Sequence, residues 1–236
     1  MRERILNSNV FWEFDKSSGL LNISGSGEMP WMIKVVSTGH KKAETTYEMP
    51  WRDFRDQIQS VIFSDGVSTV SAISFWGCTN LKEVILPSVI SISPSAFYEC
   101  HSLTEVVAPR VVSIGNSAFS RCFSLKRIVP EKDNLQKWKL DSLLFIDDFG
   151  FSDCKSLEKI VFNNLKAIGE GAFIGCKSLK SISTERLYMI SSLAFSACES
   201  IETMRVREGC SISSDAFFNT NIQEPTSFIE KQSGAE

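Results

Sequence analysis

Residues 89–106 read VISISPSAFYECHSLTEV, and this pattern of residue types recurs along the 236-residue chain. Its most constant member is a phenylalanine. Successive copies are spaced by 22 residues, except for one spacing of 32 between Phe119 and Phe151. The seven copies are Phe75, Phe97, Phe119, Phe151, Phe173, Phe195 and Phe217. Such a fixed period is the signature of a repeat architecture.

Other residue types hold fixed places relative to this phenylalanine. An aliphatic residue lies five positions before it, a small residue directly before it in most copies, and a leucine or isoleucine six after the first six copies. A cysteine follows three positions after each of the first six, and Thr220 takes that place in the seventh. These cysteines are Cys78, Cys100, Cys122, Cys154, Cys176 and Cys198.

A 22-residue unit cannot bury its own apolar side, so neighbouring units must stack into a solenoid with a continuous core. The short β-branched stretches, such as 81–86, predict strands that pair in a parallel sheet. The polar residues before each phenylalanine, such as 93–95, predict a tight turn leading into a short helical or 3₁₀ turn.

The pattern resembles the BspA-like, treponemal-type leucine-rich repeats over roughly Ile58 to Ile222. The segment Trp12-x-Phe14-Asp15, with Pro50-Trp51 further on, resembles the stretch that often precedes such repeats. The resemblance implies an α+β or mainly β fold, a right-handed leucine-rich-repeat solenoid with a parallel sheet on one face. It also implies a non-enzymatic adhesion or surface protein, most often secreted.

Three regions follow from this reading. Residues 1–57 form an N-terminal cap: a β-hairpin of 11–15 and 20–24, a polar excursion, and a short helix over 51–57. Residues 58–222 form the solenoid of about seven repeats, with an insertion near 130–139. Residues 223–236 form a polar C-terminal tail that we expect to be frayed.

Composition disfavours several function classes. The formal net charge of −3 supplies no basic excess to neutralise phosphates, so we expect no nucleic-acid partner. His40 and His101 are the only histidines, which disfavours metal sites, and we expect no cofactor and no enzymatic activity. No apolar run is long enough to predict a membrane span. The N-terminus shows no signal peptide, so a cytoplasmic location stays open beside a secreted one.

The cysteine column admits two further interpretations. Neighbouring rungs lie about 4.8 Å apart, which does not exclude disulfides. However, stacked side chains point the same way, and each cysteine would compete for two neighbours. Zinc sites use close cysteine pairs or histidine partners, which the column lacks. We therefore expect reduced, buried thiols that act as small hydrophobic side chains.

The outward face of the sheet is the candidate binding surface. Strand alternation predicts a solvent-facing apolar column of Ile62, Ile85, Val107, Val129 and Val161. Its charged neighbours are Glu83, Glu105, Arg127 and Lys159. Val and Ile favour strands wherever they stand, which would explain the column without function. Alternatively, an apolar stripe rimmed by charge marks an interaction site.

The predicted function is a protein-binding or adhesion module of a bacterial surface or secreted protein, with a host or bacterial surface protein as partner. The charged insertion, with Trp138, is a second candidate surface. One alternative is a structural spacer within a longer surface protein. Another is a carbohydrate-binding module, suggested by Trp31, Trp51, Trp76 and Trp138.

Overall fold

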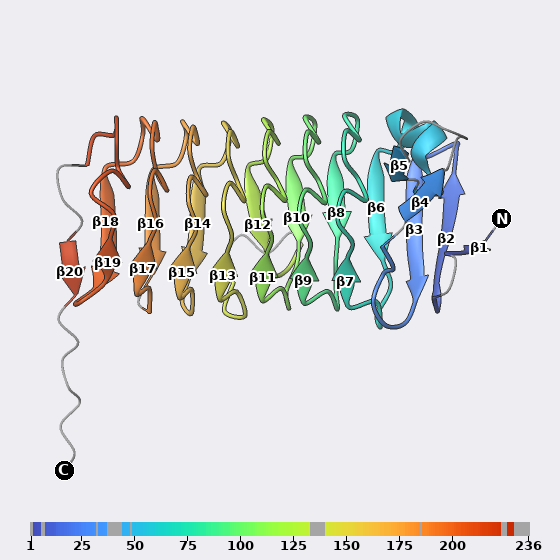
Figure 1. The fold of residues 1–236 in the computed structure, drawn as a ribbon, viewed down its shortest axis with the longest axis horizontal. Helices are drawn as coiled ribbons and strands as arrows, with labels where there is room; N and C mark the ends of the chain where they lie inside the picture. Colours follow the sequence, from blue (N-terminus) through green and yellow to red (C-terminus); the bar gives the residue numbers. More distant parts are fainter. Residues whose placement is uncertain are drawn as a thin grey trace, which may run out of the picture.

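A computed structural model describes residues 2–5, 8–31, 33–36, 44–47, 49–132, 140–184, 186–222 and 226–228. The chain forms an elongated β-solenoid whose rungs stack along one axis (Figure 1). Among the described residues, strands and turns account for the whole fold except for one short 3₁₀ helix. The predicted solenoid is confirmed, and its class is mainly β.

One long face carries the predicted parallel sheet, with one strand from each rung. The first four solenoid strands pair in register and are β6 (Ser60–Phe63), β8 (Glu83–Ile85), β10 (Glu105–Val107) and β12 (Arg127–Val129). A separate sheet continues this face with β14 (Lys159–Phe162), β16 (Ser181–Thr184), β18 (Thr203–Arg207) and β20 (Thr226–Phe228). The face is therefore divided after β12.

A second parallel sheet, which sequence reasoning did not predict, runs without a break along the other side of the core. Each strand has two residues, of which the second is the aliphatic residue five positions before the phenylalanine. The strands are β7 (Thr69–Val70), β9 (Ser91–Ile92), β11 (Ser113–Ile114), β13 (Phe145–Ile146), β15 (Ala167–Ile168), β17 (Met189–Ile190) and β19 (Ser211–Ile212). Their first residues form an outward row.

The phenylalanine column is the centre of the core. Neighbouring rings stack nearly parallel, with centroids 5.1 Å apart for Phe75 and Phe97 and 5.3 Å apart for Phe173 and Phe195. The insertion does not disturb the stack, because Phe119 and Phe151 remain 5.4 Å apart. Trp51 stacks on Phe75 at 5.4 Å and so closes the N-terminal end of the column.

The column cysteines are free and buried, as predicted, but they are also hydrogen-bonded. From the second rung onward, each thiol donates to the carbonyl oxygen of the phenylalanine one rung back. Cys122 donates to Phe97 at 3.1 Å and Cys154 donates to Phe119 at 3.2 Å. Burial raises the pKa of the Cys198 thiol to about 12. The Cys198 thiol therefore remains a protonated donor at neutral pH.

The corner around each phenylalanine is a series of tight turns, so the predicted tight turn is confirmed and the helical or 3₁₀ turn predicted to follow it is wrong. The backbone N–H groups of Trp76 and Cys78 bond within the rung, to Ile73 and Phe75. Those of Phe75 and Gly77 instead bond to carbonyls of the next rung. This alternation requires left-handed residues two before and two after the phenylalanine. Ten of them are not glycine: Ile73, Ser95, Glu99, Ser117, Arg121, Phe149, Asp153, Leu193, Ala197 and Asn219.

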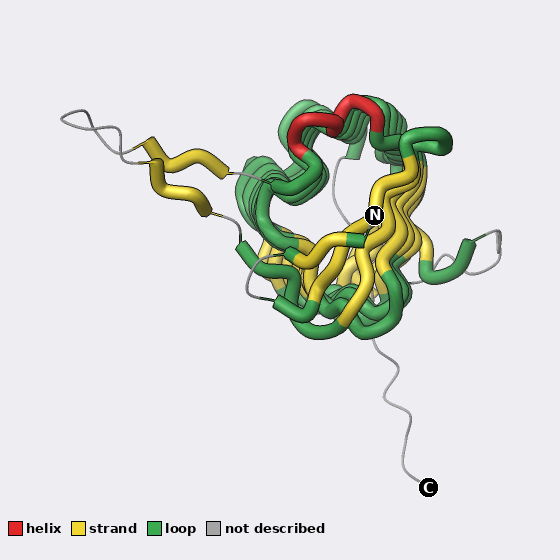
Figure 2. Tube along the Cα trace, turned by 90° about the vertical axis from the view of Figure 1, so that its right-hand side faces the viewer, coloured by secondary structure: helices red, strands yellow, loops and turns green. Residues whose placement is uncertain are grey.

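The N-terminal hairpin forms as predicted, from β2 (Val10–Asp15) and β3 (Leu20–Gly25), with a short β1 (Glu3–Arg4) on its edge. Strand β3 pairs in parallel with β6 and so joins the cap to the first rung. The 3₁₀ helix η1 spans Arg52–Gln57. Within the polar excursion, β4 (Ile33–Val36) and β5 (Glu44–Tyr47) pair antiparallel and project away from the rungs (Figure 2).

The C-terminal region departs from the expectation of a frayed tail. Strand β20, within the predicted tail, pairs in parallel with β18, with Arg205 opposite Thr226. Because β18 would otherwise present an unpaired row of backbone N–H and C=O groups, a following β-compatible segment, Thr-Ser-Phe, can extend the sheet.

The left-handed corner positions generate a stability prediction. Gly77 has a φ of +67°, and a Cβ added there would meet only Arg55 Nη1, at 4.0 Å. Gly77→Ala should therefore lower the free energy of unfolding by about 1 kcal/mol, through backbone conformation alone. Ala197 has a φ of 56°. Ala197→Gly should therefore raise the free energy of unfolding by about 0.5 kcal/mol or more.

Urea denaturation of the two variants checks this prediction. Ala72→Gly is the matched control, because Ala72 is similarly half-buried but is absent from the positive-φ positions. It should lower the free energy of unfolding by about 0.5–1 kcal/mol. A loss of stability in Ala197→Gly as large as in Ala72→Gly would contradict the strained-corner account.

Candidate interaction surfaces

The register of the long face confirms the predicted in-and-out alternation. Ile62, Ile85, Val107 and Val129 pair along one row, and Glu83, Glu105 and Arg127 pair along the next. The residues between these rows point into the core and are buried: Val61, Val84, Val106 and Ile128.

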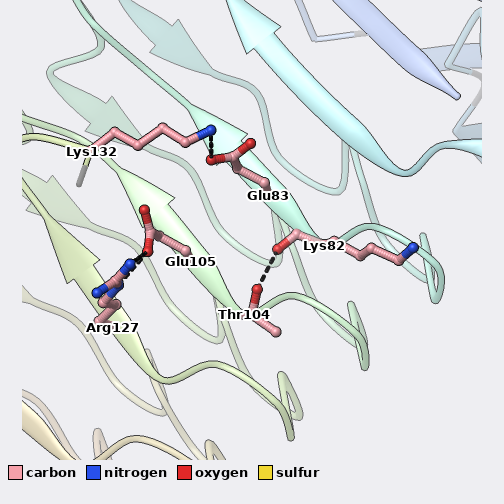
Figure 3. Close-up of polar contacts among 6 residues, drawn as sticks. All are labelled: Lys82, Glu83, Thr104, Glu105, Arg127 and Lys132. Carbon is pink, nitrogen blue, oxygen red and sulfur yellow. Dashed lines mark hydrogen bonds and ion pairs between the residues drawn. The ribbon is translucent and has the colours of Figure 1, made fainter. Parts of the chain in front are cut away.

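The predicted solvent exposure of this row is wrong for its central members. Val107 is 7% exposed and Val129 is 4% exposed, whereas Ile62 and Ile85 are half-buried. The chain that leaves β12 turns back across the face. The Nζ atom of Lys132 lies 2.6 Å from Oε1 of Glu83, two rungs back (Figure 3). The apolar row is thus covered at its centre, whereas Ile62 and Ile85 at its N-terminal end and Val161 beyond β12 are half-buried.

The charged neighbours pair with each other rather than facing solvent alone. Arg127 forms an ion pair and a hydrogen bond with Glu105, which is only 9% exposed. Lys132 pairs with Glu83, as Figure 3 shows. The predicted rim of two negative and two positive charges is therefore largely neutralised within the chain. Trp138, the other sequence candidate, lies outside the described residues.

The insertion also divides the row. Ala108 donates its backbone N–H to Val129 of the next rung, at 2.9 Å. Pro130 holds the equivalent place one rung later and has no N–H to donate. Leu140, after the insertion, makes that bond instead, to the carbonyl of Val161 at 3.1 Å. Beside this break lies a cleft of about 540 Å³, lined by Thr104, Glu105, Lys126, Arg127, Glu158 and Lys159.

A second apolar surface lies on the two-residue strands. Phe145, Ala167 and Met189 occupy one row of paired residues. Phe145 is 37% exposed and Met189 is 41% exposed, while Ala167 between them is buried. Tyr188 and Phe149 extend the exposed surface. We call these four large residues, Phe145, Phe149, Tyr188 and Met189, the second-sheet patch.

Sequence reasoning missed this patch because two-residue strands have no period of their own. A signal was nevertheless present in the repeat. The position directly before the aliphatic residue is small and polar in four rungs, as Thr69, Ser91, Ser113 and Ser211. Phe145 and Met189 hold this position in two other rungs. The core does not require a large apolar residue there.

Carboxylates border the second-sheet patch at one corner. Asp147, Asp148 and Glu170 are exposed, and within the described residues no cation pairs with them. The backbone N–H of Glu170 donates to Asp148 Oδ1 at 2.7 Å. Burial, and then the neighbouring Asp148 charge, raise the pKa of Asp147. Among the described residues, no ion pair therefore neutralises this corner.

The three tryptophan candidates within the described residues differ in exposure. Trp31 is 61% exposed and Trp76 is 51% exposed, as a surface role requires. Trp51 is buried, and its Nε1 donates to the carbonyl of Ser74 at 2.8 Å, so its predicted exposure is wrong. Its burial follows from its place at the end of the phenylalanine column.

In the described part of the chain, no group of three or more His, Cys, Asp or Glu side chains is arranged to hold a metal ion. None of its helices has the length and apolarity needed to span a membrane.

Comparison with known proteins gives a family and a fold. The family model described as the BspA type leucine-rich repeat region matches residues 53–138 and 131–231. A leucine-rich repeat protein of T. pallidum aligns with 22% identity and a TM-score of 0.56, over 89% of this chain and 85% of that one. A leucine-rich cell surface protein of Faecalibacterium prausnitzii aligns with 18% identity and a TM-score of 0.33, over 100% and 95%. No curated protein matched.

The patch border generates a pH-dependent prediction. Because the folded state raises the pKa of Asp147, its charged form costs stability at neutral pH, and that cost fades as pH falls through the folded pKa. Asp147→Asn should therefore be more stable than the parent chain at pH 7. Urea denaturation at pH 7 and pH 4 should show the difference shrinking at the lower pH.

Asp215 provides the opposite case. The hydroxyls of Ser213 and Ser192 donate to its carboxylate, each at 2.7 Å, and lower its pKa. Asp215→Asn should lose stability at pH 7, and the deficit should disappear as pH falls through the lowered pKa. Shifts of the same sign in both variants would contradict the assigned environments.

Proposed function

This chain belongs to the BspA-type leucine-rich repeat family, and we propose that it is a non-enzymatic protein-binding module of a bacterial surface or secreted protein. The family is one of bacterial surface proteins and is generally non-enzymatic. Its repeats build a rigid frame whose outward positions are free to vary, which suits a protein-interaction role.

The second-sheet patch is the observation that carries this proposal. Large apolar residues are normally covered, and a cluster of them on one rigid face marks an interaction site. Phe145, Tyr188 and Met189 are each more than a third exposed, whereas the core columns need none of them. The row from Phe145 to Met189 spans two strand spacings, or about 10 Å.

The border indicates the chemistry of the partner. Asp147, Asp148 and Glu170 lie next to exposed phenylalanines and have no paired cation among the described residues. A protein segment that carries apolar side chains beside lysine or arginine would complement both features. We propose such a segment, on a host or bacterial surface protein, as the ligand, and adhesion as the result.

The outward row of the long sheet is the competing surface. Ile62 and Ile85 remain half-exposed at its N-terminal end, and Val161 lies beyond the break. Its other apolar members, Val107 and Val129, would have to be uncovered before a partner could reach them. This row is therefore the weaker candidate, and it supplies a matched comparison.

The test compares two double variants of the chain. Phe145→Ser with Met189→Ser alters the second-sheet patch, and Ile62→Ser with Ile85→Ser alters the long face. Each is immobilised and exposed to solubilised host-surface and bacterial-surface proteins, after circular dichroism has shown that it folds. Captured proteins are then measured for affinity to each chain.

We expect the patch variant to bind its captured partner at least tenfold more weakly than the parent, and the long-face variant to bind it unchanged. A loss confined to the long-face variant would assign binding to the sheet predicted from sequence. Unchanged binding in both variants would contradict a role for either surface.

A further inference from the structure

A small pocket lies between η1 and the first rung, away from both surfaces described above. Its volume is about 230 Å³, and its lining includes Met49, Trp51, Trp76, Arg52 and Arg55. The pocket thus combines an aromatic wall with two guanidinium groups.

The two arginines both line the pocket from η1. A kink at Phe54, with a φ of −128°, lies between them in the helix, and both arginines are exposed. The Nε atom of Arg55 lies 3.9 Å from Oδ1 of Asp56, which is a long ion pair. Arg52 forms no ion pair within the described residues. Most guanidinium donors therefore remain open to a ligand.

The aromatic wall is held in place from behind. Trp51 is fixed by its hydrogen bond to Ser74 and by its stack on Phe75. Trp76 is 51% exposed and packs edge-on against Tyr98, with ring centroids 6.5 Å apart. An exposed indole offers a negative π face that attracts the positive edge of C–H bonds, such as those of a sugar ring.

We propose that this pocket binds the acidic ring of a carboxylate-bearing saccharide. The sugar ring would pack on Trp76, and its carboxylate would accept hydrogen bonds from Arg52 and Arg55, which suit planar, bidentate recognition of carboxylates. A volume of about 230 Å³ accommodates one sugar ring rather than an oligosaccharide. This ligand is independent of the protein partner proposed for the second-sheet patch.

The test is a titration of the full chain with small probes, in which binding is monitored by tryptophan fluorescence and by NMR. The probes are methyl glucuronoside and the methyl glycoside of N-acetylneuraminic acid, with methyl glucoside and acetate as comparisons. We expect saturable binding of at least one acidic sugar, and at least tenfold weaker binding of methyl glucoside and of acetate. The two acidic probes distinguish a uronic acid from a sialic acid as the source.

Variants assign the binding to the pocket. Arg52→Gln and Arg55→Gln should each weaken acidic-sugar binding at least fivefold, and Trp76→Ala should do the same. Arg186→Gln and Trp31→Ala change an exposed arginine and an exposed tryptophan outside the pocket, and they should bind as the parent chain does.

Three results would overturn the proposal. Equal affinity for methyl glucoside would remove the role of the arginines. Equal affinity for acetate would indicate a simple anion site. An equal loss in Arg186→Gln would indicate general charge attraction. Because the pocket shares no residue with the second-sheet patch, failure here leaves the proposed protein-binding function standing.

Discussion

Every rung of this protein must place one phenylalanine ring flat over the ring of the rung before it. The rings repeat at 5.1–5.4 Å, slightly more than the strand spacing of a sheet. The 22-residue period follows, because each circuit of the chain must return to the same point. Three features help each circuit to close at that point. They are the small residue before the ring, the left-handed corner residues and the thiol bonded to the previous rung.

The same constraint explains where the chain can vary. The ten extra residues enter at Pro130, where the long sheet loses its ladder, yet Phe119 and Phe151 remain stacked. Outward positions are similarly free, and there the rungs differ most. The exposed Phe145 and Met189 replace small polar residues without disturbing the buried Ile146 and Ile190 behind them. Variation that packing does not explain is where binding is expected.

Sequence reasoning predicted what the repeat dictates: the solenoid, the buried columns, the strand alternation and the free thiols. It failed where the answer depends on long-range structure. Val107 and Val129 are covered by the path of the chain after β12, which no local pattern encodes. The second sheet has strands too short to show alternation. Trp51 lies 24 residues before Phe75, close to one period, and that spacing could have placed it at the end of the column.

Deleting one complete rung tests the central claim most directly. Removing residues 156–177 joins Lys155 to Ser178 and leaves the repeat in register. The chain should still fold, unfold cooperatively and be shorter by one strand spacing, about 4.8 Å, in small-angle X-ray scattering. Removing residues 158–177, which takes out 20 residues instead of 22, leaves two extra residues within a rung and should give a lower free energy of unfolding than the 22-residue deletion. Equal stability of the two deletions, or unfolding of both, would contradict the requirement for ring-over-ring register.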